Sequence, residues 1–161
     1  MIKEIAVFIL VFSVYIIYTG SFTAYDMFTG ILISIFISMY SARFLVSNER
    51  KLMDPRRAFT LIYYLVKYMV IIELRAHIDV IKRIFTMDIK PGIVKIPVRS
   101  TTEYGKLLVA MSITNTPGTV VVYEKNGYFY VNWIYVKTFE PEKAYTEISS
   151  EFEKYAIKVF E

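Results

Sequence analysis

Two ionisable residues one helical turn apart are the first candidates for chemistry in this sequence. Glu73 and His77 stand at positions i and i+4, which places both side chains on one face of a helix. An imidazole titrates near neutral pH, so a Glu–His pair could pass a proton. The same spacing is typical of a structural pair or of a polar contact with another protein of the same complex. We expect the structural role, because a transmembrane proton path needs a longer chain of ionisable groups.

The rest of the sequence offers little for catalysis. It has no cysteine and one histidine, which excludes thiolate chemistry, cysteine-ligated iron–sulfur clusters and multi-histidine metal sites. No nucleophile–base arrangement is visible. Asp26 could be an ion-pathway carboxylate, although a helix cap at the membrane surface explains it more simply. We therefore predict a chain that is not an enzyme and that has no catalytic residue, cofactor or metal site.

Two long apolar runs make up most of the first 45 residues. They are residues 5–19 and residues 27–45. They contain no Asp, Glu or Lys, and one Arg near the end of the second run. A bilayer core needs about 20 helical residues, so residues 2–19, just long enough, and residues 27–45 predict two membrane spans. The short turn at 20–26 makes them an antiparallel hairpin, with Asp26 as the expected N-cap of the second helix. No small-x-small cleavage site follows the first run, so we expect a retained span rather than a signal peptide.

The second span carries small residues at every fourth position. They are Gly30, Ser34, Ser38 and Ala42. Small residues at this spacing let helix backbones approach closely in lipid, so we predict a packing face toward the first span or toward a neighbouring protein of the complex. The alternative is that small residues are simply common in membrane helices.

The placement of basic residues predicts the orientation. The turn at 20–26 has no Lys or Arg, whereas residues 43–57 have five. By the positive-inside rule, both the N-terminus and the segment after the hairpin are cytoplasmic, in a multi-pass protein of the cell membrane. The net charge of +4 lies within residues 1–85. Its expected partner is therefore the lipid head-group region rather than nucleic acid.

Residues 59–85 predict an amphipathic helix within a basic linker segment, 46–85. Its polar side is basic and rich in tyrosine: Arg57, Thr60, Tyr64, Lys67, Tyr68, Arg75, Asp79 and Lys82. Its apolar side holds Ile62, Val66, Val70, Ile81 and Ile84, together with Glu73 and His77. This pattern favours a helix lying along the cytoplasmic membrane surface. A third span, which would place the following domain outside, is the alternative.

Residues 86–161 predict a small cytoplasmic α/β domain of order β-α-β-β-α, which makes the whole chain a membrane α+β protein. Strands are expected at 93–99, at 119–124 and at 128–136, and helices at 102–114 and from Pro141 to about 155. Asn126-Gly127 is a strong hairpin signal, and Pro97 suggests an edge strand. The aromatic residues of 128–135 should alternate between the core and a surface for partner docking.

Two segments of this domain, GIVKIPV at 92–98 and LLVAMSITNTPGTV at 107–120, resemble motifs of one known family. The matching motifs, G-I-V-x-I-P and LLANSITLTPGTV, are those of the MrpE/MnhE family, a family of small components of multisubunit Na+/H+ antiporters. The loop residues that carry the match are Ser112, Thr114, Thr116, Pro117, Gly118 and Thr119. They suit a tight turn between a helix and a strand rather than a nucleotide site, because no Gly-x4-Gly-Lys-Ser/Thr pattern is present.

The resemblance implies an accessory, structural subunit of a monovalent cation/proton antiporter module. Its partners would be the other subunits and the lipid bilayer. The family commonly has Y-V-H-x-L-D-V where this chain has YVNWIYV at 130–136, with Asn132 for the His and Tyr135 for the Asp. Homologues also occur in archaeal membrane-bound hydrogenases and related complexes. The departure at Asn132 and Tyr135 favours a parent complex of this second kind. A homo-oligomeric channel or transporter and a membrane-anchored binding module remain the alternative functions.

Overall fold

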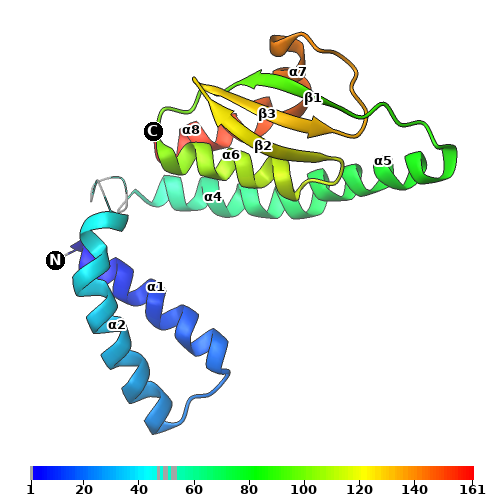
Figure 1. The fold of residues 1–161 in the computed structure, drawn as a ribbon. Helices are drawn as coiled ribbons and strands as arrows, with labels where there is room; N and C mark the ends of the chain where they lie inside the picture. The colour runs from blue at the N-terminus through cyan, green and yellow to red at the C-terminus, as the bar shows by residue number, and fades with distance from the viewer. Residues whose placement is uncertain (1, 47, 49–50, 52–53) are drawn as a thin grey trace. The chain divides into compact units, whose positions relative to one another are not determined.

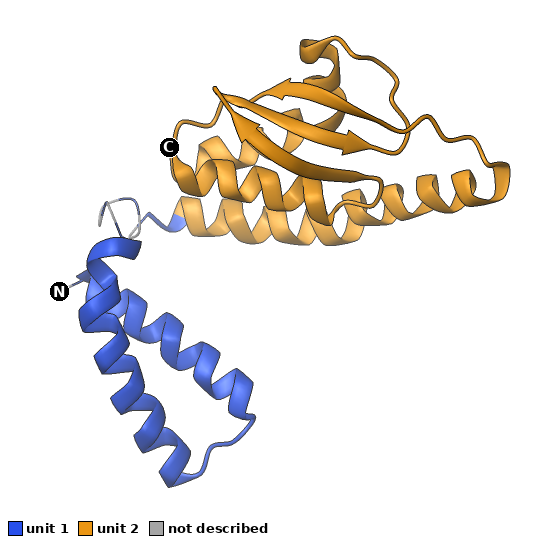
Figure 2. Ribbon diagram, viewed as in Figure 1, with its two compact units in different colours: residues 1–55 blue, residues 56–161 orange. Residues whose placement is uncertain are grey.

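The computed structural model describes residues 2–46, 48, 51 and 54–161, and its contacts divide the chain into two compact units. These are residues 1–55 and 56–161 (Figure 2). The helix that follows the linker packs within the second unit, whereas the sequence pattern had set residues 46–85 apart from the domain. Each unit has its own interior and is described in turn.

The first unit is a helical hairpin of α1 (Ile2–Thr19) and α2 (Ala24–Leu45) (Figure 1). Both helices are long and apolar enough to cross a membrane. The buried residues of α2 are the four small ones, Gly30, Ser34, Ser38 and Ala42. A Cβ added to Gly30 would lie 2.7 Å from the Tyr15 ring of α1. The small side chains therefore set how closely the two helices approach.

The turn between α1 and α2 corrects the predicted N-cap. Thr23, not Asp26, caps α2, because its hydroxyl accepts a hydrogen bond from the Asp26 backbone N–H at 3.2 Å. The Asp26 carboxylate then accepts hydrogen bonds from the hydroxyls of Ser21 at 2.5 Å and Thr23 at 2.6 Å. Asp26 is thus the acidic third residue of α2, bonded to two hydroxyls of the turn, and α2 begins three residues earlier than expected.

One continuous helical rod opens the second unit. It consists of α4 (Pro55–Lys67), the π-helix η1 (Tyr68–Ile72) and α5 (Glu73–Thr86). Pro55 is well placed at the start of α4, where its missing N–H costs nothing. At the other end Met87 takes a left-handed conformation, φ 55°, and donates its N–H to the Arg83 carbonyl. The rod is therefore longer at both ends than the predicted helix, and a π-helical segment interrupts it.

The sheet of the second unit is antiparallel, with strand order β1-β3-β2. Its strands are β1 (Gly92–Pro97), β2 (Thr119–Lys125) and β3 (Tyr128–Trp133). Asn126 and Gly127 both have positive φ, 52° and 74°, which is the geometry that a tight β2–β3 hairpin needs. β1 is an edge strand and ends at Pro97.

Three helices complete the domain: α6 (Glu103–Asn115), α7 (Pro141–Ile148) and α8 (Ser150–Phe160). Thr102 caps α6 by accepting a hydrogen bond from the Gly105 N–H at 3.1 Å. The single helix predicted from Pro141 is in fact two, because the backbone leaves helical geometry at Ser149, with φ −121° and ψ −17°. The element order after the rod is therefore β-α-β-β-α-α rather than β-α-β-β-α.

The core lies between one face of the sheet and the helices. Its members from the sheet are Val94, Ile96, Phe129, Val131 and Trp133. α6, α8 and the rod add Val109, Ile113, Phe152, Ala156, Tyr64 and Tyr68. Fully burying a large apolar side chain of this kind stabilises the fold by about 1.5–3 kcal/mol. The intervening residues Tyr130 and Asn132 lie on the opposite face of the sheet from Val131, as strand alternation requires.

Candidate functional site: the rod and the signature loop

Two tyrosines fasten the rod to the domain. Tyr64 is 1% exposed, hydrogen-bonds the Ser112 hydroxyl, and its ring centroid lies 5.1 Å from that of Tyr155. Tyr68, one turn on, packs edge-on against Phe152. Burial raises the pKa of the Tyr64 phenol to about 12, and burial also raises the pKa of Tyr68. Both phenols are therefore neutral hydrogen-bonding groups at physiological pH.

The expectation that these tyrosines belong to a water-facing polar side is wrong. The tyrosine side of the rod packs into the core, and the opposite side is exposed. Ile62, Val66, Val70, Ile81 and Ile84 are each at least half exposed. The domain covers the tyrosines that were expected to face water. The π-helix η1 also shifts the helical phase, so Arg75 and Lys82, expected on the tyrosine side, are exposed instead. A phenol can pack its ring in a core while its hydroxyl finds a polar partner, so Tyr is as compatible with burial as with water.

A polar network joins the π-helix to the signature loop. The Tyr68 hydroxyl donates to Glu73 Oε1 at 2.6 Å, and the Asn115 amide donates to the same oxygen at 3.0 Å. The Tyr68 hydroxyl also lies 3.2 Å from the Thr116 hydroxyl and from the Ser112 carbonyl. Because Glu73 accepts from two elements at once, it links the rod to α6. It therefore points toward the domain and not to the exposed apolar side where the sequence had placed it.

His77 does lie beside Glu73, as its spacing predicted. Its Nδ1 is 2.8 Å from the Glu73 carbonyl oxygen and 3.3 Å from Glu73 Oε2. The imidazole is 59% exposed, whereas the Glu73 side chain is 14% exposed. The two groups could exchange a proton. In the described part of the chain the network continues only to Tyr68, Asn115 and hydroxyl groups, with no further carboxylate or lysine.

The signature loop is a closely bonded turn between α6 and β2. The hydroxyl of Thr116 donates to the Ser112 carbonyl at 2.7 Å, and that of Thr119 to the Ile113 carbonyl at 2.7 Å. The Thr114 hydroxyl accepts a hydrogen bond from the N–H of Val121 on the edge strand β2. Gly118 has φ +92°, and an added Cβ would lie 2.9 Å from the Ile134 side chain. Its residue types thus serve the turn geometry, as the sequence indicated.

A cavity of about 350 Å³ lies between α5 and the rest of the domain. Trp133 and Phe152 form part of its apolar lining, and Thr116 and Thr119 of the signature loop line it as well. Its charged lining residues form ion pairs: Asp79 with Arg83, Lys137 with Glu147, and Glu151 with Lys67. Among the described residues, no group of three or more His, Cys, Asp or Glu side chains could hold a metal ion.

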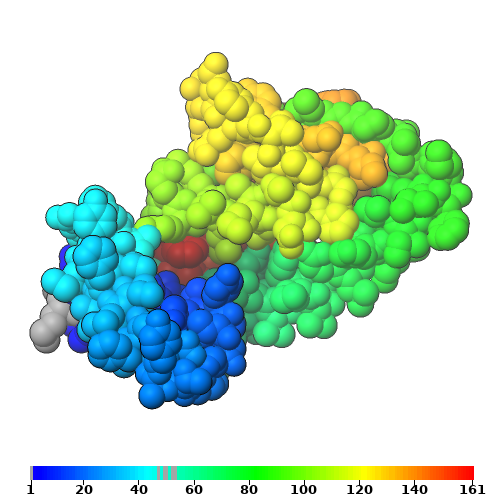
Figure 3. Space-filling model, turned by 60° about the horizontal axis from the view of Figure 1, so that its bottom comes forward, coloured from blue at the N-terminus to red at the C-terminus, as the bar shows by residue number. Residues whose placement is uncertain are grey.

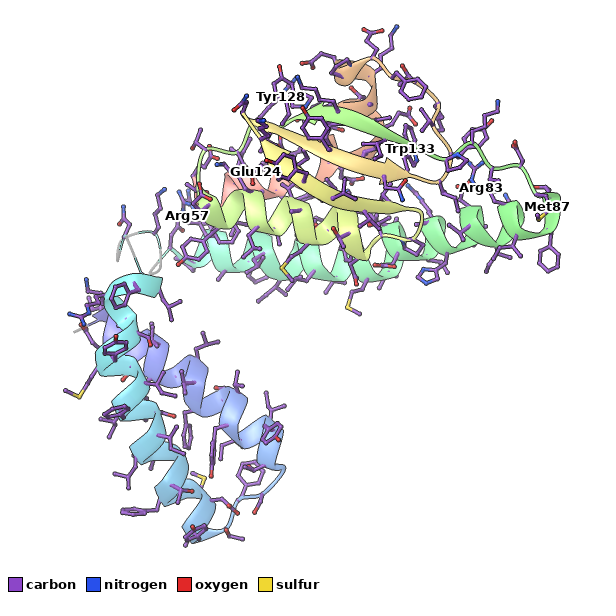
Figure 4. All side chains as sticks on the ribbon, viewed as in Figure 1. Arg57, Arg83, Met87, Glu124, Tyr128 and Trp133 are labelled. Carbon is purple, nitrogen blue, oxygen red and sulfur yellow. The ribbon has the colours of Figure 1, made fainter. Side chains whose placement is uncertain are left out.

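Arg83 secures the far end of α5, a role that the sequence pattern did not reveal. Figure 4 labels Arg83 near the end of α5. Its guanidinium lies 3.9 Å from the centroid of the Tyr135 ring and makes a bidentate pair with Asp79 at 2.7 and 3.0 Å. It also donates to the Asp88 carbonyl. The i, i+4 spacing of Asp79 and Arg83 predicts their ion pair. The contact of Arg83 with Tyr135 could not be predicted from any sequence pattern.

Comparisons with known proteins agree with this architecture. Residues 8–159 match the sequence model of the MNHE family, described as Na+/H+ ion antiporter subunit. The chain is 31% identical over 150 residues to the E-type subunit of the Na+/H+ antiporter of Alkalihalophilus pseudofirmus, covering 91% of this chain and 90% of that protein.

A solved structure is similar over almost the whole chain. It is a chain in the structure of the membrane-bound sulfane sulfur reductase, an archaeal respiratory membrane complex, with a TM-score of 0.84 and 26% identity. The alignment covers 99% of this chain and 100% of that one. Because the family match runs through both the hairpin and the domain, this chain belongs to the MNHE family of Na+/H+ antiporter subunits.

Proposed function

We propose that this chain is an accessory, structural subunit of a Mrp-type multisubunit Na+/H+ antiporter module. The module would be either a free antiporter or part of an archaeal respiratory complex. The main support for this proposal is that the family match spans both compact units rather than a single motif. The similarity to a chain of an archaeal respiratory membrane complex supports the second setting. The partners are then the other subunits of a hetero-oligomeric membrane assembly.

The hairpin is proposed to pack against the ion-conducting subunits. Its small residues are already occupied between α1 and α2, so other surfaces must meet those partners. The outward faces are strongly apolar, and Val14, Phe36 and Met39 are each more than half exposed. Such surfaces suit either lipid or the helices of neighbouring subunits, where van der Waals packing drives association.

The rod is proposed to lie on the cytoplasmic membrane surface, with the domain on the same side. Its outer face, here called the apolar ridge, comprises Phe59, Ile62, Val66, Val70, Leu74, Ile78, Ile81, Ile84 and Phe85. All nine are between 45% and 83% exposed. A soluble monomer rarely leaves so long a contiguous apolar surface uncovered. The tyrosines on the opposite side of the rod hold it to the domain, so the ridge can face the bilayer while the domain stays in water. Part of the rod (residues 55–86, teal to green) lies at the surface of the second unit in the view of Figure 3.

No catalytic role is proposed for Glu73 and His77. Glu73 is committed to hydrogen bonds from Tyr68 and Asn115, which gives it a structural task at the π-helix. The ion path would run through other, channel-forming subunits, and this chain would support their arrangement.

Purification in a mild detergent from the native membrane, followed by mass spectrometry, tests the proposal. We expect several multi-spanning subunits to co-purify in fixed proportion, and their identity would name the parent complex. A homo-oligomer would indicate a channel built from the hairpin alone. A monomer would indicate an independent membrane-anchored binding module. Either of these two results would contradict the accessory role.

A further inference from the structure

Two basic side chains of the rod form no ion pair among the residues that the structure describes. Both, Arg75 and Lys82, are exposed. They are seven residues apart, so they lie on nearly one line along α5. Ile78 and Phe85 continue that line at i+3 and i+4 spacings. The two cations therefore border the apolar ridge.

The rod has two acidic residues, Glu73 and Asp79, and both accept hydrogen bonds from other side chains. Glu73 is turned toward Tyr68 and Asn115, and Asp79 is paired with Arg83. Asp79 lies one helical turn from Arg75 and from Lys82, and its side chain is 56% exposed. Long basic side chains beside an apolar face can bury their stems in the acyl region and hold their charges at the level of the head groups.

The chain itself limits how far the ridge can be from a bilayer. α2 ends at Leu45 and α4 begins at Pro55, and a fully extended connection between them spans only about 35 Å. The ridge, residues 59–85, is about 40 Å long at the rise of an α-helix. A lipid surface is therefore within reach of the rod, and it is the partner whose apolar and charged layers match the ridge and its border together.

We propose that Arg75 and Lys82 bind the phosphate groups of anionic phospholipids and so select an anionic leaflet for α5. This inference rests on the proposed function, in which the ridge faces the bilayer, and adds the class of lipid and the residues that recognise it. Each cation near an anionic surface favours docking about fivefold. Together they favour the docked state by about 25-fold, an effect that added salt should weaken.

The chain has no cysteine, so a single spin label can report where α5 lies. The full chain with Phe85→Cys is labelled and placed in nanodiscs of phosphatidylcholine alone or with one quarter phosphatidylglycerol. Depth is measured from the accessibility of the label to oxygen and to a water-soluble nickel chelate. We expect burial of the label with phosphatidylglycerol and its reversal by Arg75→Gln with Lys82→Gln. The matched control, Lys154→Gln with Lys158→Gln on α8, should leave the depth unchanged.

The other outcomes would overturn the inference without touching the accessory role, which co-purification tests separately. Equal burial in both lipids and in the double variant would mean that the ridge docks on lipid without selecting head groups. A label in water under all conditions would mean that a protein partner, and not lipid, covers α5.

Discussion

In the hairpin the buried residues of α2 are Gly30, Ser34, Ser38 and Ala42, whereas the core of residues 56–161 is built around large side chains such as Tyr64, Phe129 and Trp133. The difference follows from the solvent. In water, burying a large apolar side chain stabilises the fold, so large residues gather inside. In lipid the tails are as apolar as leucine, and helices associate through close backbone approach. The two units should therefore respond in opposite ways to changes in side-chain size.

The largest effect is expected from truncation in the domain. Phe129→Ala removes a 2%-exposed ring from the sheet and leaves a cavity, which should cost about 3–5 kcal/mol. The midpoint of chemical unfolding in detergent, followed by Trp133 fluorescence, measures this. Val122→Ala on the same sheet is the control, because Val122 is half exposed and its loss should cost far less.

Enlargement should be the damaging change in the hairpin. Ser34→Leu inserts a side chain where α1 and α2 touch, which should cost about 1–3 kcal/mol and lower the yield of assembled complex. Ser34→Ala keeps the size and serves as the control. Since no described group hydrogen-bonds the Ser34 hydroxyl, this control should be close to neutral. Unchanged yield and unchanged helix contacts in Ser34→Leu would contradict a packing role for the small residues.

A smaller, pH-dependent effect should distinguish the domain from the hairpin. The folded-state pKa of Tyr64 is about 12, against about 10 for an ordinary tyrosine, because burial disfavours the phenolate. The resulting stabilisation is fully present below pH 10 and is lost as the pH rises from about 10 to about 12. Unfolding measured across this range should show the loss, and Tyr64→Phe should reduce it. An identical pH dependence in Tyr64→Phe would rule out Tyr64 as its source.

The smallest effect is expected at the candidate proton pair. Glu73→Gln retains an oxygen that Tyr68 and Asn115 can donate to, and His77→Gln changes a mostly exposed side chain. Ion transport by the assembled complex should stay within a few-fold of normal in both variants. Assembled complexes that have lost transport would instead establish a proton relay, because each change removes a titratable group.

Local signals accounted for much of the architecture. The two long apolar runs predicted both hairpin helices, and Asn126-Gly127 predicted the turn that joins β2 to β3. The errors have a common cause, which is that a helix pattern does not say what covers each side. Tyr64 and Tyr68 were assigned to water because a phenol is amphipathic, and the break at Ser149 depends on the packing of α7 and α8. In the candidate site, the spacing of Glu73 and His77 can be read from the sequence. The contacts of Glu73 with Asn115 and of Arg83 with Tyr135 cannot, because each joins residues more than 40 positions apart.

The comparison assumes that the hairpin crosses the membrane and that residues 56–161 lie in water on the cytoplasmic side. Two variants, each with a single cysteine, test this membrane topology directly. Ser21 lies in the turn of the hairpin and Asn126 in the turn between β2 and β3. Ser21→Cys and Asn126→Cys are treated in turn with a membrane-impermeant maleimide, in right-side-out and in inverted vesicles. We predict labelling of position 21 from outside and of position 126 from the cytoplasmic side. Labelling of both from outside would contradict this topology, because the rod would then have to cross the bilayer.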